Sequence, residues 1–241
     1  MNPLPFVLTG LLLASCARHG ADQGPQPLRT VQDAAAIERC QALFPQSRMQ
    51  LVHTIAFRMA HGEYGNALGV LVLDGPAIEC ALMTVEGFTL FSARSSGPDD
   101  LRIDRAVPPF ANRDFAAGLM RDVRLLFRTP EGAPAAGTLP DGAPVCRFQA
   151  RDRLVDLLPR TDGGWQLREF SGQSMLRVDG CLLETRETQW REARSVDAAP
   201  PRASGPAHLA ATMNLTAPGP AGYTLNLRLL EAAPLPDASQ P

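Results

Sequence analysis

Cysteine and histidine are the residue types in this sequence with the widest choice of chemistry, because both can ligate metals and take part in catalysis. The five cysteines are Cys16, Cys40, Cys80, Cys146 and Cys181, and the four histidines are His19, His53, His61 and His208. The histidines form no close pair, and the cysteine spacings match no zinc motif. We therefore expect no metal site and no cofactor.

Recognisable catalytic motifs do not occur in the sequence. It contains no Gly-x-Ser-x-Gly nucleophile elbow, no phosphate-binding loop, no His-Glu-x-x-His and no Cys-x-x-Cys. All 23 basic residues are arginine, which excludes a lysine nucleophile or Schiff base. Asp99 and Asp100 are adjacent carboxylates, but they follow Gly-Pro and are interpreted as part of a solvated turn. We expect a protein that is not an enzyme and has no catalytic residues.

His53 admits two interpretations. It falls at an inward-facing position of the alternating apolar pattern in residues 48–59. An inward histidine can be a hydrogen-bonded core or cavity residue, or it can be a general base. The sequence offers His53 no evident serine or cysteine partner, so we favour the structural interpretation.

The N-terminus has the features of a bacterial lipoprotein signal. Residues 4–14 form an apolar run that is shorter than the roughly 20 residues of a membrane-spanning helix but suits a signal-peptide core. The run ends in Leu13-Ala14-Ser15-Cys16, which resembles the lipobox of bacterial lipoproteins. The resemblance implies that residues 1–15 are removed and that Cys16 is lipidated, with palmitate among its acyl chains. The alternatives are an ordinary secretory signal and a buried N-terminal segment, since Met1-Asn2-Pro3 has no basic side chain.

The residues after Cys16 concern the location of the protein. Ala17 follows the cysteine. In Gram-negative lipoproteins an aspartate at that position tends to mean retention in the inner membrane. The resemblance therefore implies the outer membrane, with the protein lipid-anchored on its periplasmic face. Residues 16–28 are rich in Gly, Pro and Gln, and we expect a flexible tether that spans at most about 40 Å.

The other four cysteines form an even set, in a compartment where disulfides persist. Four cysteines allow three connectivities. Proximity in the chain favours the pairs Cys40–Cys80 and Cys146–Cys181. Buried free thiols remain the alternative.

The elements that position these residues begin with a helix. We expect Thr30 as its N-cap, Val31 to Phe44 as its body, and Pro45 as its end. Alternation of apolar and polar residues then predicts half-buried strands. The strands expected in this half are residues 48–59, 68–73, 77–85, 88–94 and 101–106.

A second helix is expected after Pro108-Pro109, with Asn112 as its cap. Its stripe of Arg121, Arg124 and Arg128 could contact lipid head groups or an acidic cargo, or it could be a solvated helix face. Residues 131–144 and 198–206 are expected as loops, and 232–241 as a loose C-terminal tail. Further strands are expected at 145–150, 153–158, 165–170, 175–183, 185–194, 209–215 and 223–229.

This pattern predicts a mainly β protein with two helices, in the α+β class. A sheet of about eleven antiparallel strands tends to curl rather than stay flat. We expect a curled half-barrel whose concave face is covered by the helices. Residues 29–231 would form this single domain.

The layout resembles the LolA/LolB-like outer-membrane lipoprotein superfamily, in particular its uncharacterised lipoprotein branch. The resemblance rests on the strand pair 51–59 and 67–74, the hairpin that ends in Glu86-Gly87-Phe88-Thr89-Leu90-Phe91, and Ala106-Val-Pro-Pro-Phe110 before the arginine-bearing helix. It implies a half-barrel carrier fold that binds or transfers lipid or lipoprotein cargo in an apolar cavity, without catalysis.

The apolar faces of the strands can form a packed core or line a cavity that holds acyl chains. If they line a cavity, the candidate residues are Leu51, Ile55, Phe57, Val70, Leu82, Phe91, Phe115 and Leu119. The expected partners are the membrane, through the anchor, and a lipid or lipoprotein cargo. The alternative function is that of a structural or assembly lipoprotein, which contacts an envelope protein partner through its Pro-rich loops. The net charge of −2 argues against nucleic acid as a partner.

Overall fold

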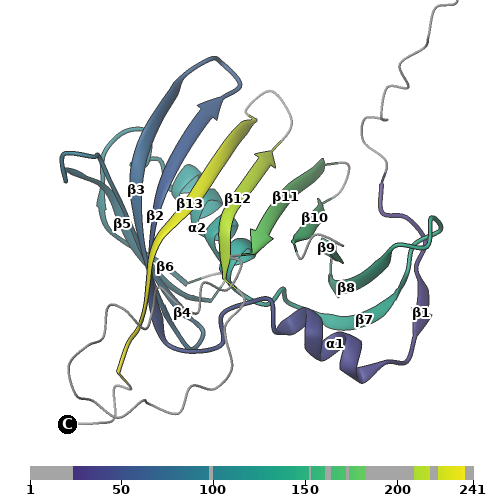
Figure 1. Cartoon of the computed structure of the whole chain (residues 1–241). Coiled ribbons are helices and arrows are strands. Elements are labelled where there is room, and N and C mark those ends of the chain that lie inside the picture. Colours follow the sequence, from purple (N-terminus) through teal and green to yellow (C-terminus); the bar gives the residue numbers. More distant parts are fainter. Residues whose placement is uncertain are drawn as a thin grey trace, which may run out of the picture.

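The computed structural model describes residues 24–97, 100–151, 153–160, 164–171, 174–182, 209–217 and 222–236. Within these residues, thirteen strands form a single antiparallel sheet, and two helices lie against it (Figure 1). The elements of the first half are β1 (Arg29–Val31), α1 (Ala34–Gln41), β2 (Met49–Met59), β3 (Tyr64–Asp74), β4 (Ala77–Met83), β5 (Thr89–Gly97), β6 (Asp100–Ala106) and α2 (Arg113–Phe127). Those of the second half are β7 (Ala133–Thr138), β8 (Pro144–Ala150), β9 (Arg153–Pro159), β10 (Trp165–Ser171), β11 (Ser174–Leu182), β12 (Ala210–Ala217) and β13 (Tyr223–Pro234).

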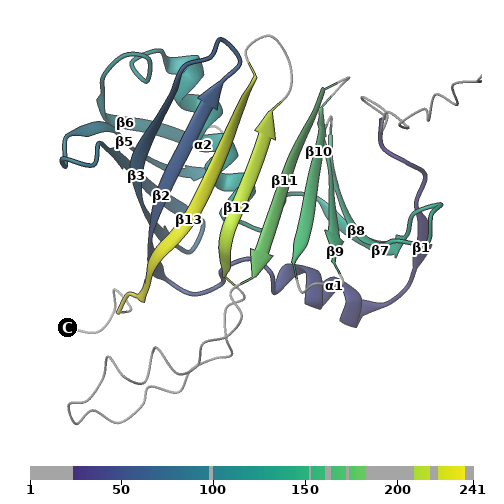
Figure 2. The ribbon, with the colours of Figure 1, turned by 45° about the horizontal axis from the view of Figure 1, so that its top comes forward.

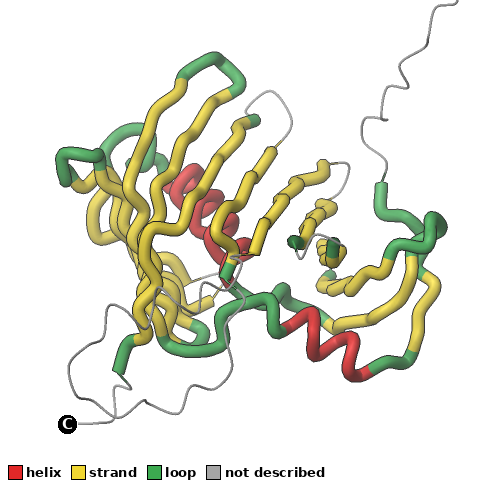
Figure 3. The backbone as a smooth tube through the Cα atoms, viewed as in Figure 1, coloured by secondary structure: helices red, strands yellow, loops and turns green. Residues whose placement is uncertain are grey.

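The sheet curls but does not close. Its strand order is β1-β7-β8-β9-β10-β11-β12-β13-β2-β3-β4-β5-β6, so β1 and β6 are the two edges. The helix α2 lies behind β12, β13 and β2 in the view of Figures 1 and 3, on the inner side of the curl. The expected fold class, a mainly β open half-barrel with helices, is therefore confirmed.

Strand β2 forms where the sequence alternates between apolar and polar residues, whereas β3 is mostly apolar. In β2 the side chains of Met49, Leu51 and His53 are buried, and those between them are only half-buried. Gly75 and Gly87 lie in the turns after β3 and β4 with φ of +51° and +88°, values that glycine adopts without strain. The expected strands of this half thus occur, with ends that differ by a few residues.

The first helix begins later than expected. Thr30, the expected N-cap, lies instead in β1, which pairs with β7. The cap is Asp33, whose carboxylate accepts a hydrogen bond from the Ala36 N–H at 3.1 Å. Aspartate is among the strongest N-capping residues, and its position sets the start of α1 at Ala34.

Strand β7 occupies part of the segment that was expected to be a loop, and that prediction is wrong. Its small residues allow close approach of β1, since a Cβ on Gly137 would collide with the backbone carbonyl of Arg29. Next to this contact, Leu28 packs against the buried side chains of Leu139 and Val145. The expected tether therefore ends before Leu28, which already belongs to the folded domain.

The last strand extends further than expected. A register shift between Leu229 and Glu231 turns Ala232 toward the interior, where it pairs with Leu51 and is buried. Residues 232–234 consequently belong to β13, and the prediction of a loose tail from residue 232 is wrong. Residues 237–241 lie outside the described residues, as do the expected strand 185–194 and the expected loop 198–206.

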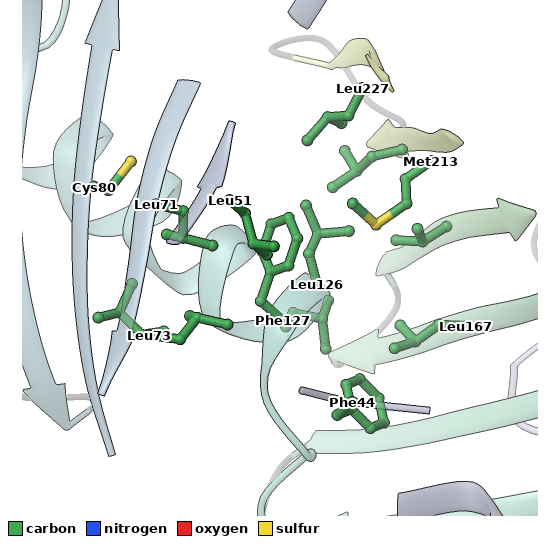
Figure 4. Close-up of a cluster of buried hydrophobic side chains, with 14 of the residues drawn as sticks. Phe44, Leu51, Leu71, Leu73, Cys80, Leu126, Phe127, Leu167, Met213 and Leu227 are labelled. Atoms are coloured by element: carbon green, nitrogen blue, oxygen red, sulfur yellow. The ribbon is translucent and has the colours of Figure 1, made fainter. Parts of the chain in front are cut away.

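The hydrophobic core lies between α2 and the inner face of the sheet. Figure 4 shows Leu126 and Phe127 of α2 between Leu51 on one side and Leu167 and Met213 on the other. Leu51, Leu167 and Met213 belong to β2, β10 and β12. Helix α2 therefore packs against strands from both halves of the chain. Figure 2, turned by 45°, shows the same helix behind the central strands.

The disulfide pairing differs from the expected one. Cys40 of α1 pairs with Cys146 of β8, with their Cα atoms 6.4 Å apart, and not with Cys80. Cys80 is a buried free thiol on β4, and burial raises its pKa to about 12. The pairs Cys40–Cys80 and Cys146–Cys181 are both wrong, because α1 packs against β7 and β8. Cys181 lies in β11, and its side chain is outside the described residues.

The edge strand β6 presents charged side chains at alternate positions. Asp104 forms ion pairs with Arg94 and Arg102, each at 3.2 Å. Arg105 lies over the Phe88 ring, 5.1 Å from its centroid. Such charges on an exposed edge disfavour pairing with another strand. Among the described residues, no helix combines the length and the apolarity that a bilayer span requires.

Candidate functional site

Helix α2 has an apolar face and a charged face, and each borders a different part of the space inside the half-barrel. Asn112 caps it as expected, and its side-chain oxygen accepts hydrogen bonds from the N–H groups of Asp114 and Phe115 at 2.9 and 3.1 Å. The face toward the sheet is apolar and includes Ala116, Met120, Leu126 and Phe127, which are all buried. The opposite face carries Asp114, Ala117, Arg121, Arg124 and Arg128 at helical spacing.

The apolar side of α2 encloses only a small cavity. Its volume is about 20 Å³, and Leu51, His53, Phe127 and Trp165 are among its lining residues. That is room for about one water molecule. Between α2 and β2 the interior is therefore packed, which favours the packed-core interpretation of these strand faces.

His53 is a core residue of this packed region. Its side chain is 3% exposed, and its ring centroid lies 5.3 Å from that of Phe127. Burial lowers the pKa of His53 to about 4, so the imidazole is uncharged at neutral pH. These observations agree with the structural interpretation of His53.

The arginine side of α2 borders a much larger cleft, with a volume of about 420 Å³. The cleft lies between α2, the adjoining ends of β5 and β6, and the hairpins formed by β8, β9 and β10. Its lining residues are Ser95, Gly97, Leu101, Asp114, Ala117, Gly118, Met120, Arg121, Arg124, Leu125, Arg128, Thr129, Pro130, Glu131, Ala150, Arg153, Val155 and Glu169. This volume is in the range of small-molecule sites, about 300–1,000 Å³.

One wall of the cleft is polar. Arg124 donates hydrogen bonds to the Ser95 hydroxyl at 3.0 Å, to the Ser95 carbonyl at 3.3 Å and to the Pro76 carbonyl at 3.3 Å. Arg128 donates to the Ala77 carbonyl at 2.7 Å. These bonds join the end of α2 to β4 and β5 and hold both guanidinium groups in place.

Across the cleft, the side chains come from distant parts of the chain. Arg153 of β9 lies 3.5 Å from Glu169 of β10, which is buried. The apolar part of the lining includes Leu101 of β6, Met120 of α2 and Val155 of β9. The cleft is therefore amphipathic, with apolar and cationic groups in one space.

A hydrogen bond between a half-buried tyrosine and a buried aspartate positions the middle of α2. The hydroxyl of Tyr223 on β13 hydrogen-bonds to the carboxylate of Asp122, which is 4% exposed. Burial raises the pKa of Asp122 to about 6, although the Tyr223 hydrogen bond and the Arg121 charge lower it. Burial and the neighbouring Asp122 raise the pKa of Tyr223.

Asp122 and His53 should give the free energy of unfolding opposite slopes against pH. The pKa of Asp122 is raised in the folded state from 3.8 to about 6, so its contribution to stability is full below pH 3.8 and is lost as pH rises through about 6. The pKa of His53 is lowered from 6.5 to about 4, so its contribution is full above pH 6.5 and is lost as pH falls through about 4. The two slopes largely cancel between these limits.

We expect Asp122→Asn to uncover the His53 slope. The free energy of unfolding of this variant should rise between about pH 4 and 6 more steeply than that of the native protein, by up to about 1 kcal/mol per pH unit. Urea unfolding at a series of pH values measures this difference. Ala117→Ser, an exposed change on the same helix that adds no titratable group, is the control and should leave the slope unchanged. Parallel curves for Asp122→Asn and the native protein would contradict the assignment.

The eight candidate cavity residues do not lie together. Five of them belong to the packed core: Leu51, Leu82 and Phe91 are buried in it, and Ile55 and Leu119 pack against it. Phe57 lies near the end of β2 against Gly65, and Phe115 is 38% exposed beside the Phe110 ring. Val70 is on the outer face, where it pairs with Val52, so its assignment to the interior is wrong.

None of these eight residues lines the cleft beside α2, although Phe57 lines a second cleft of about the same volume that is bordered by β2, β3, β12 and β13. The sequence signal that does lead to the cleft beside α2 is the arginine stripe of that helix. Leu101, Val155 and Glu169 of the other walls come from β6, β9 and β10, and no local pattern shows that these strands face each other. Ser95 lies beyond the end of the expected strand 88–94, although it is a buried residue of β5 that anchors Arg124.

Two further predictions concern residues of other kinds. Cys16 and the rest of the lipobox lie outside the described residues. Nowhere in the described ranges do three or more His, Cys, Asp or Glu side chains gather in an arrangement that could hold a metal ion.

Comparison with solved structures gives an informative likeness. No family model and no curated protein matches the chain. The structure is similar to that of a LolA superfamily protein from Nitrosomonas europaea, with a TM-score of 0.52 and 13% sequence identity, over 86% of this chain and 96% of that chain. At this identity the likeness concerns the fold alone, which is that of a LolA-like open half-barrel.

Proposed function

We propose that the protein is an outer-membrane lipoprotein, anchored through Cys16 on the periplasmic side, that binds a lipid or the acyl chain of a lipoprotein without chemical conversion. The observation that carries the proposal is the cleft of about 420 Å³ beside α2, inside a LolA-like half-barrel. The anchor is supported by the Leu13-Ala14-Ser15-Cys16 sequence after an apolar run.

The lining of the cleft suits an amphipathic ligand. Leu101, Met120, Leu125 and Val155 offer apolar contacts, which gain free energy in proportion to the apolar surface that the ligand removes from water. Polar groups in the same space would fix the orientation of the ligand, as in most small-molecule sites. A LolA-like fold is typically a carrier fold, which supports binding rather than catalysis.

Binding of a neutral apolar probe tests the proposal. The full chain with Cys16→Ser, which lacks the acylated residue, should bind diphenylhexatriene saturably, with an increase in fluorescence. Leu101→Gln should weaken this binding about fivefold, because part of an apolar wall is lost. Leu230→Gln is the matched control, since Leu230 is 54% exposed on β13 and should leave binding unchanged.

Absence of saturable probe binding would contradict the cleft as a lipid site. For the anchor, the native chain expressed in a Gram-negative host should incorporate labelled palmitate, and the Cys16→Ser chain should not. Equal labelling of both chains would contradict lipidation at Cys16.

A further inference from the structure

We infer that Arg121, Arg124 and Arg128 bind the anionic head of the ligand, a carboxylate or phosphate joined to the acyl chain. The inference rests on the proposed function for the acyl chain and adds the charge class of the head group. It concerns the arginine wall of the cleft, whereas the acyl chain would contact the apolar walls.

The spacing of the three arginines places them on one wall. Arg121 and Arg124 lie three residues apart on α2 and so share a face, and Arg128 is the residue that caps the end of the helix. All three side chains line the cleft, together with Ala117 from the preceding turn. Their guanidinium groups therefore face one space.

The charges of these arginines are poorly matched by carboxylates. Among the described residues, the ion pair that involves this set joins Arg121 to Asp122 at 3.9 Å. Arg124 and Arg128 donate instead to uncharged acceptors, the hydroxyl and backbone carbonyls of Ser95, Pro76 and Ala77. Their positions are thus fixed, while their positive charges are left for another partner.

Arg128 also has hydrogen-bonding capacity to spare. Its Nε is buried and has no hydrogen-bond partner among the described residues, although its Nη2 is bonded. A buried donor without an acceptor costs free energy, and a shift of this side chain toward an anion in the cleft would relieve that cost.

The acidic residues that line the cleft do not neutralise the positive charge of the arginines. Glu169 is already paired with Arg153 at 3.5 Å. Asp114 lies in the first turn of α2, and Arg128 follows its last residue. Glu131 is exposed and remains as the acid near Arg128. Asp122 partly offsets Arg121, and Asp74 acts on Arg128 from outside the cleft lining, whereas Arg124 has no carboxylate partner among the described residues. That end of the cleft therefore keeps an excess of positive charge, which favours an anion.

A substitution of Arg121 can distinguish a role in ligand binding from a role in helix stability. Basic residues near a helix C-terminus stabilise the helix, and the hydrogen bonds of Arg124 and Arg128 fit such a role as well. Arg121 lies further from that end, and its side chain is 57% exposed. Its substitution should therefore change ligand binding and leave folding intact.

The test compares two ligands with the same chain and different heads. At pH 8, oleic acid and oleyl alcohol compete with diphenylhexatriene for the full chain with Cys16→Ser. Oleate should displace the probe at a concentration about tenfold lower than the alcohol. Arg121→Gln should remove most of this preference, and Arg121→Lys should keep much of it. Arg228→Gln, at an exposed residue of β13, should leave it unchanged.

The outcomes separate this inference from the proposed function. Equal displacement by both ligands, or a preference that Arg121→Gln leaves intact, would overturn the anionic head while acyl-chain binding stands. Micromolar binding of inorganic phosphate without a preference for oleate would assign the arginines to a free anion and overturn the head-group assignment. Failure of the probe itself to bind would overturn the proposed function, and the inference with it.

Discussion

Replacement of Phe127 by alanine is expected to lower the free energy of unfolding by about 3–5 kcal/mol, the usual cost of removing a buried phenylalanine ring. Phe127 is 6% exposed at the end of α2 and lies next to His53 and Leu51 (Figure 4). The small cavity beside it would become larger, because α2 is also held by Arg124 and Arg128 and cannot simply move inward. Urea unfolding followed by tryptophan fluorescence measures the loss.

Phe88→Ala is the control for this variant. The Phe88 ring is 52% exposed in the turn before β5, where it contacts Arg105. Its removal should cost less than about 1 kcal/mol. Equal losses for the two variants would show that α2 does not pack against the sheet as the structure has it.

Loss of the Cys40–Cys146 disulfide is expected to have a comparable effect. The two residues are 106 positions apart, and a cross-link over about 100 residues stabilises a protein by roughly 4–5 kcal/mol when it acts by restricting the unfolded chain. Cys40→Ser should therefore lower the free energy of unfolding by that amount under oxidising conditions. Peptide mapping of the native protein without reduction should recover Cys40 and Cys146 in one linked fragment.

Reduction supplies the internal control for this variant. Dithiothreitol should destabilise the native protein about as much as the substitution does, and it should leave the Cys40→Ser variant unchanged. A linked fragment that contains Cys80 in place of Cys146, or a native protein that is insensitive to reduction, would contradict the pairing.

The parts of the fold that were predictable are those set by local pattern. Alternation gave β2, where buried and half-buried residues follow one another, and the capping preference of Asn112 gave the start of α2. Val70 was misplaced because residues 67–73 of β3 are apolar or glycine on both faces, so the sequence does not show which face is inner. β7 was missed because its Ala and Gly residues resemble a loop and are suited to close approach of β1.

The candidate site was only partly predictable for a different reason. The arginine stripe of α2 is local, and its spacing alone places three cations on one face. The walls that face it depend on how the sheet curls, which brings Leu101 of β6 and Val155 of β9 to the same cleft. The pairing of Cys40 with Cys146 depends likewise on the docking of α1 onto β8, and not on distance along the chain.

The charged residues of the edge strand β6 affect how copies of the protein interact when they lie close together on one membrane surface. If the chain is anchored, neighbours meet at high local concentration, and a half-barrel with two unpaired edges could polymerise by adding strand to strand. A strand added beside β6 would have to desolvate Arg102, Asp104 and Arg105, a cost that backbone hydrogen bonds would not easily offset. Crowded copies should therefore not pair through β6.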